Sequence, residues 1–189
     1  MKFQCTNYKR IGFMVIKSGK IDITDPGYDN DSWCGMHGVT VKPGKYYCYV
    51  STLKGAMAKE WGKRIVSMLI VHADADTSEP LGFNEIGSVG VDAGLMSISE
   101  SGVKPNYSDT NWGECMFHLD DLEKNCKNGL DAFVSTKFSL GKKPKKQFWS
   151  STGFGDGMYG VYSIDSHDQS AAEYIPDAVM VEFITPFDD

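Results

Sequence analysis

The sequence lacks most of the features that mark secreted, membrane or nucleic-acid-binding proteins. Its five cysteines are odd in number and form no C-x-x-C pair, which argues against a disulfide framework and a zinc ribbon. No run reaches the ~18 apolar residues of a membrane-spanning helix, and Met1–Arg10 carries no apolar signal-peptide core. A net charge of −6 disfavours general nucleic-acid binding. We therefore expect a cytoplasmic protein with reduced thiols and no membrane contact.

Motifs of nucleophilic and phosphate chemistry are also missing. The chain has no G-x-S-x-G nucleophile elbow. The glycine-rich Gly153–Gly157 lacks the Gly-Lys-Ser/Thr of a phosphate-binding loop, and an apolar strand pattern follows it where a helix is required. Cys34 lies near His37 in sequence, but a catalytic Cys–His pair is defined in space. These absences make an enzyme the less favoured hypothesis without excluding one.

Short apolar runs between glycine, proline, asparagine and aspartate make up most of the chain. The 189 residues are 41% hydrophobic and 23% charged, which fits one globular domain over residues 1–189. The runs predict strands at Gly12–Ile16, Lys20–Thr24, His37–Val41, Lys45–Thr52, Lys63–Ala73, Ser88–Ile98, Ala132–Leu140, Gln147–Thr152, Met158–Ile164 and Ala178–Ile184. Clustered strands with one or two helices predict a β-rich α+β fold, a mostly antiparallel sheet or sandwich. The apolar residues Ile65, Val66, Met68, Leu69, Ile70 and Val71 leave little alternation in Lys63–Ala73, which predicts a central strand covered on both faces.

One helix is predicted, over Glu114–Asn128, within a helical insertion at about residues 102–129. Its apolar positions recur at helical spacing: Cys115, Leu119, Leu122 and Cys126. Gly129 stands where a helix is often terminated.

Two aspartate–glycine strings stand out, Val91-Asp92-Ala93-Gly94 and Gly153-Phe154-Gly155-Asp156-Gly157. The first allows a bulged single strand or two strands that meet at a tight turn. The second predicts a β-hairpin turn. With Asp25-Pro26-Gly27-Tyr28, each string places a carboxylate at a strand end.

Three carboxylates from these strings, Asp25, Asp92 and Asp156, form the main candidate site. If the strand ends converge, the carboxylates can bind a divalent cation or act as an acid–base pair. The alternative, which we favour, is that each accepts hydrogen bonds from turn amides. With the neighbouring tyrosines, the predicted ligand-binding residues are Asp25, Tyr28, Asp92, Asp156 and Tyr159.

Other polar clusters have ordinary explanations. Asp165-Ser166-His167-Asp168 offers metal or acid–base chemistry but is more typical of an exposed loop. The basic residues Lys142, Lys143, Lys145 and Lys146 form a cluster that fits either an acidic partner or a solvated loop. His72 ends a buried-looking strand before Asp74 and Asp76, while His37 and His118 stand alone; a lone histidine is more often structural than a ligand.

The order of the strings resembles an uncharacterised bacterial family, domain of unknown function 4241. The similar elements are the Pro43-Gly44-Lys45-Tyr46 strand start, the Val91–Gly94 string and Gly153–Tyr159, so the resemblance covers roughly residues 43–183. Small phage proteins carry similar strings after an Asp-Pro-Cys-Tyr-like start, which Asp25–Tyr28 resembles with Gly27 in place of cysteine. The resemblance implies a β-rich fold and no particular activity.

Two function classes follow. The first is a non-catalytic binding protein of bacterial or phage origin, of immunity, inhibitor or counter-defence type, that recognises a protein or a small ligand. The second is a metal-assisted hydrolase or ligand-binding enzyme that uses Asp25, Asp92 and Asp156. Neither class specifies an oligomeric state.

Overall fold

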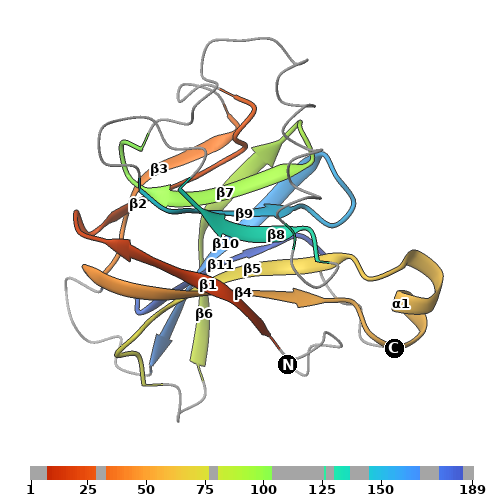
Figure 1. Ribbon diagram of the computed structural model, residues 1–189, viewed down its shortest axis with the longest axis horizontal. Helices are drawn as coiled ribbons and strands as arrows, with labels where there is room; N and C mark the ends of the chain where they lie inside the picture. Colours follow the sequence, from red (N-terminus) through yellow and green to blue (C-terminus); the bar gives the residue numbers. More distant parts are fainter. Residues whose placement is uncertain are drawn as a thin grey trace.

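The protein is built from two antiparallel β-sheets. The computed structural model describes residues 8–28, 33–76, 81–103, 126, 130–136, 145–166 and 175–184. In chain order the elements are β1 (Lys9–Ile16), β2 (Lys20–Thr24), β3 (Gly35–Thr40), β4 (Gly44–Thr52), α1 (Gly55–Trp61), β5 (Ile65–His72), β6 (Leu81–Val91), β7 (Leu95–Glu100), β8 (Ala132–Ser135), β9 (Gln147–Ser151), β10 (Gly157–Ser166) and β11 (Ala178–Glu182). Figure 1 shows the sheets as two layers, with α1 projecting from one end. The predicted β-rich α+β fold is confirmed.

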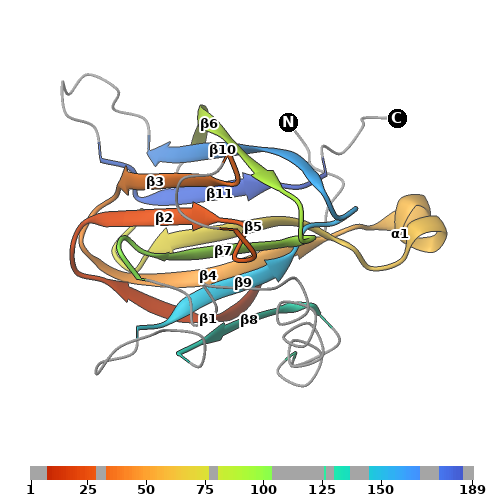
Figure 2. The same ribbon diagram turned by 90° about the horizontal axis from the view of Figure 1, so that it is seen from above.

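The two sheets differ in size and share no strand. One has six strands in the order β1-β4-β5-β11-β10-β6, and the other has five in the order β3-β2-β7-β9-β8. Along both pairs of edges the layers approach each other, with β1 beside β8 and β3 beside β6. Figure 2 shows most strands running along the long direction of the molecule, with β6 crossing it at an angle, so many of the connections lie at two opposite ends.

Alternating side chains form one core between the sheets. Met14 and Ile16 of β1, and Ile21 and Ile23 of β2, have no exposed surface and belong to the same cluster, although β1 and β2 lie in different sheets. The prediction that the run within 63–73 is a central strand is confirmed. β5 lies inside the six-stranded sheet, and its outward-facing Leu69 packs into a second cluster with Ile164, Ala178 and Met180.

The two aspartate–glycine strings are the turns that carry the chain from one sheet to the other. Residues 92–94 join β6 of the six-stranded sheet to β7 of the five-stranded sheet, so the interpretation as two strands meeting at a tight turn is confirmed. Residues 152–156 join β9 to β10, which also belong to different sheets. The predicted hairpin at Gly153–Gly157 is therefore wrong. A hairpin turn and a turn that crosses between two sheets can both contain glycine. Only the pairing of the flanking strands, which is decided over long separations in the chain, distinguishes the two.

Some elements differ from the prediction or lie outside it. The strand predicted from Ser88 begins earlier, at Leu81. The sequence pattern did not indicate α1, which has no buried residue and is capped after Trp61 by Gly62 with φ +81°. The helix predicted over Glu114–Asn128 lies, apart from Cys126, outside the described residues, as do His118, His167, Asp168, Lys142 and Lys143. Within the described ranges, no helix has the length and apolar character needed to cross a membrane.

Candidate functional site

Three connections meet at the end of the molecule that carries α1. They are Asp25–Tyr28 after β2, residues 92–94 between β6 and β7, and residues 152–156 between β9 and β10. We call this region, together with Trp33, Trp61–Arg64 and Met158, the loop end. All five predicted ligand-binding residues lie in it or on the adjoining start of β10.

Asp25 holds the turn between the sheets. Its Oδ2 accepts the N–H groups of Asp92 at 2.8 Å and Ala93 at 2.7 Å, and its Oδ1 accepts the N–H of Gly27 at 2.8 Å. The side chain is fully buried. Burial raises the pKa of Asp25 above its ordinary value, and the negative charge of Asp92 adds to this, against the lowering effect of the three N–H groups. Asp25 thus performs the favoured alternative, accepting hydrogen bonds from turn amides.

Tyr28 completes a clasp on the same turn. Its hydroxyl donates a hydrogen bond to Oδ2 of Asp92. That bond to a carboxylate is the main reason why the pKa of Tyr28 lies well above its ordinary value. Asp25 and Tyr28 therefore grip Asp92 through its backbone and its side chain, so the β2–β3 connection is fastened to the β6–β7 turn.

Tyr159 and Asp156 lie outside the group formed by Asp25, Tyr28 and Asp92. The buried Tyr159 hydroxyl lies 3.0 Å from the carbonyl oxygen of Thr152 and 2.6 Å from that of Gly155, where it stiffens its own turn. Asp156 is exposed. The 152–156 turn nevertheless touches the Asp92 turn, because the N–H of Thr152 donates to the carbonyl of Gly94 at 3.2 Å.

The structure therefore brings together Asp25, Tyr28 and Asp92, and leaves Asp156 outside. Among the described residues, no group of three or more histidine, cysteine, aspartate or glutamate side chains is arranged to hold a metal ion. The three-carboxylate cation site does not form in this geometry. Both carboxylate oxygens of Asp25 already accept hydrogen bonds from backbone N–H groups, which is typical of a structural carboxylate rather than of a metal ligand.

Large apolar side chains lie around this polar clasp, and no local sequence pattern shows that they gather there. The exposed fractions are 60% for Trp33, 60% for Met158, 53% for Phe154 and 38% for Trp61. Trp33 packs against Gly90, where an added Cβ would come within 1.8 Å of the ring. Met158 faces Gly90 across the β6–β10 pair, so the two exposed side chains adjoin. An aromatic residue inside a glycine- and aspartate-rich turn, as at Phe154, was the available signal.

The other two exposed rings contact each other. Trp61 and Phe154 meet edge to face with centroids 5.2 Å apart. The Arg64 guanidinium lies 5.2 Å from the Phe154 ring centroid and donates to the carbonyl of Gly153 at 2.9 Å. Phe154 is thus held by α1 and its C-terminal flank, and the apolar side chains are fixed to the same turns as the clasp.

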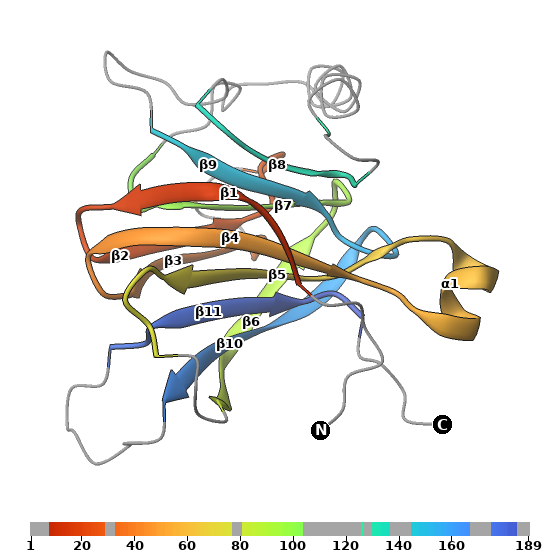
Figure 3. The same ribbon diagram turned by 60° about the horizontal axis from the view of Figure 1, so that its bottom comes forward.

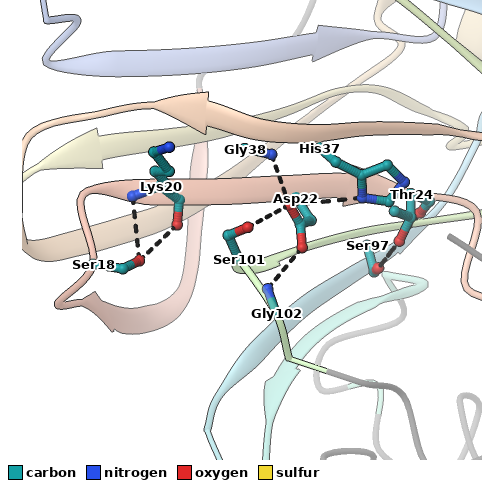
Figure 4. Close-up of polar contacts among 9 residues, drawn as sticks. All are labelled: Ser18, Lys20, Asp22, Thr24, His37, Gly38, Ser97, Ser101 and Gly102. Atoms are coloured by element: carbon teal, nitrogen blue, oxygen red, sulfur yellow. Dashed lines mark hydrogen bonds and ion pairs between the residues drawn. The ribbon is translucent and has the colours of Figure 1, made fainter.

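A second buried aspartate, Asp22, supports the five-stranded sheet elsewhere. Two residues of β3, His37 and Gly38, lie opposite it at a bulge in the β2–β3 pairing. Asp22 accepts the N–H of Gly38 at 2.8 Å, and it also accepts Ser101 Oγ at 2.8 Å and the N–H of Gly102 at 2.9 Å (Figure 4). His37 Nδ1 lies 3.7 Å from the same carboxylate, so His37 is not isolated as the sequence suggested. Asp22 therefore supplies an acceptor to the N–H of Gly38 at the bulge and to the N–H of Gly102 after β7.

Glu100 is the third buried carboxylate, at the end opposite α1. Its Oε1 accepts the N–H groups of Lys17 and Ser18, both at 2.7 Å, and its Oε2 pairs with Lys145 of the basic cluster. Burial acts to raise the pKa of Glu100, but Lys145 and the two N–H groups together lower it. The sequence analysis missed this residue because a glutamate ending a strand carries no distinctive local pattern.

We expect Glu100→Gln to lower the free energy of unfolding at neutral pH by about 1–3 kcal/mol, because the charge-assisted contact with Lys145 is lost. The loss stays within this range because Lys145 is half exposed and solvent screens the ion pair. Folding lowers the pKa of Glu100, so its contribution is present above the ordinary value of 4.5 and is lost as pH falls through the folded-state pKa. Urea unfolding between neutral and acid pH measures this. Glu60→Gln, at an exposed position of α1, is the control; equal pH profiles for Glu100→Gln and the parent chain would contradict the assignment.

Comparisons with protein-family models, with curated proteins and with solved structures found no match to this chain. The resemblance to the domain of unknown function 4241 family therefore stays a prediction.

Proposed function

We propose that this protein is a non-catalytic binding protein that recognises a protein partner through its loop end. The observation that carries the proposal is the exposure of Trp33, Phe154, Met158 and Trp61 together on that end. Aromatic residues and methionine are enriched at protein interfaces, where a few of them supply most of the binding energy. Loops at the end of a β-sandwich are also a common place for recognition.

The clasp beneath these side chains supports the same function. Asp25 and Tyr28 fasten the β6–β7 turn, and Thr152 links that turn to the one that presents Phe154. Turns fixed in this way lose little conformational entropy when a partner binds, so more of the contact energy appears as affinity. The apolar side chains are thus displayed on a preorganised surface.

The use of the buried carboxylates favours binding over catalysis. Asp22, Asp25 and Glu100 are the carboxylates among the buried described residues, and each accepts at least two backbone N–H groups. Such groups are committed to holding turns. Together with the resemblance to bacterial and phage sequences, this leads us to propose a factor of the immunity, inhibitor or counter-defence type.

Site-specific photo-crosslinking tests the proposal. A photoreactive amino acid replaces Trp33, Phe154 or Met158 at the loop end, and replaces Phe83 or Ile86, exposed positions of β6, in the controls. We expect one discrete protein adduct from the loop-end positions in extracts of the native host and none from the controls. Adducts that are absent, or equal at all positions, would overturn the proposal.

Once the partner is purified, its affinity for variants of the loop end can be measured. The double substitution Trp33→Ala with Phe154→Ala removes exposed side chains, so the fold should be retained, while affinity should fall by about 100-fold if both are hot-spot residues. Ile86→Ala on β6 is the matched control and should leave Kd unchanged. Isothermal titration calorimetry reports both values.

A further inference from the structure

A second surface lies on the outer face of the six-stranded sheet, at β1 and the start of β4. Phe13 and Tyr47 stand directly opposite each other in the β1–β4 pair. Arg10 lies 3.9 Å above the Tyr47 ring centroid, and Lys146 lies 3.5 Å above that of Phe13. Lys45 sits between the rings, 4.8 Å from Phe13 and 4.9 Å from Tyr47. We call these five residues the cationic patch.

The three cations of the patch have no carboxylate partner among the described residues. Neighbouring lysines differ, since Lys145 pairs with Glu100 and Lys42 lies 3.8 Å from Asp177. The concentration of three positive groups around two rings is notable in a chain whose net charge is −6. Aromatic faces attract cations and hold them in place, so the patch presents ordered positive charge to solvent.

Apolar surface adjoins the charge. Phe13 is 38% exposed and Val15, two residues along the same strand and on the same face, is 46% exposed. A ligand that satisfies both features carries negative groups next to an apolar side chain. β4 runs from Lys45 at this patch toward α1, so the patch lies toward the end of the sheet away from the loop end (Figure 3).

We propose that the cationic patch docks an acidic segment of a protein partner, with carboxylates on Arg10, Lys45 and Lys146 and an apolar side chain on Phe13 and Val15. The small extent of the cationic patch favours an acidic protein segment over a nucleic acid. Three cations gathered around one pair of rings match a few adjacent carboxylates, whereas a nucleic acid needs positive charge along a track of phosphates and is repelled by the acidic remainder of the chain. This inference is independent of the function proposed for the loop end.

Fluorescence anisotropy with a labelled peptide of alternating glutamate and leucine tests the inference. The patch variant combines Arg10→Gln, Lys45→Gln and Lys146→Gln. The control combines Lys20→Gln, Lys54→Gln and Lys59→Gln, exposed positions on β2 and on or beside α1 that lie outside the loop end, and removes the same positive charge. Circular dichroism verifies that both variants are folded.

We expect the peptide to bind the parent chain and the control with similar Kd, to bind the patch variant at least about 30-fold more weakly, and to lose affinity as salt rises. Failure of the parent chain to bind the peptide, or equal binding by the patch variant, would overturn the inference. A single-stranded oligonucleotide of matched length serves as competitor. If it binds more tightly than the peptide, the acidic-segment assignment is wrong.

Discussion

Replacement of Asp25 by alanine is expected to cost about 3–5 kcal/mol of unfolding free energy, because three backbone N–H groups lose their acceptor at a buried position. The groups belong to Gly27, Asp92 and Ala93, so the substitution releases the clasp that joins the β2–β3 connection to the turn between the sheets. Chemical denaturation gives the loss. Amide hydrogen exchange should show faster exchange at these three positions, ahead of the strands.

Asp156→Ala is the matched control for Asp25. Both aspartates lie beside glycine or proline in similar strings, but Asp156 is exposed, and its loss should change stability by less than about 0.5 kcal/mol. Equal losses for the two variants would contradict the role assigned to Asp25.

The pH dependence of Asp25 has the opposite sign to that of Glu100. Folding raises the pKa of Asp25, so its protonation adds stability that is fully present below the ordinary value of 3.8 and is lost as pH rises through the folded-state pKa. Asp25→Asn lacks this titration and loses one acceptor oxygen. The stability advantage of the parent chain over Asp25→Asn should therefore shrink as pH rises from acid toward neutral.

Gly44→Ala is expected to destabilise the protein by about 2–4 kcal/mol through steric overlap in a filled site. An added Cβ would lie 2.1 Å from His72 Nε2, and φ at Gly44 is +155°. The His72 ring cannot easily yield. It is buried, its Nε2 is 3.3 Å from the Pro43 carbonyl, its Nδ1 accepts the Asp74 N–H, and the Tyr46 ring meets it edge to face.

Gly38→Ala separates the overlap from backbone strain. Gly38 also has positive φ, +67°, but an added Cβ there meets nothing within 4 Å, so only a strain of about 1 kcal/mol is expected. A double-mutant cycle completes the test: with His72→Ala present, Gly44→Ala should cost less than it does alone. Additive losses would exclude His72 as the cause.

Most strands could be read from the sequence because the cause of their formation is local. Alternation at Ile21 and Ile23, and the apolar residues that fill Ile65–Ile70 apart from Ser67, indicate directly which faces are buried. The sheet to which a strand belongs is not local. β9 and β10 follow one another through a tight glycine turn, yet they do not pair with each other. β9 pairs with β7 and β8, and β10 pairs with β6 and β11, so the predicted hairpin failed.

The candidate site was predicted in part for a related reason. Turn chemistry identified Asp25 and Asp92, and the fold places them together with Tyr28. The same chemistry also selected Asp156, because an aspartate beside glycine looks alike whether it is buried or exposed. The roles of Glu100 and Trp33 could not be predicted, because their partners, Lys145 in one case and Gly90 in the other, lie far along the chain.

The sequence alone determined the strand-rich class, the acidic charge and the positions of the tight turns, since these depend on composition, alternation and the backbone freedom of glycine. Only the tertiary structure decided which turns cross between the sheets, which carboxylates are consumed by backbone N–H groups, and which side chains remain exposed. Those outcomes depend on strand pairing over long separations in the chain. The tertiary structure buries Asp25 as an acceptor for turn amides and leaves Asp156 exposed to solvent. It also places the exposed side chains of Trp33, Phe154 and Met158 together at one end.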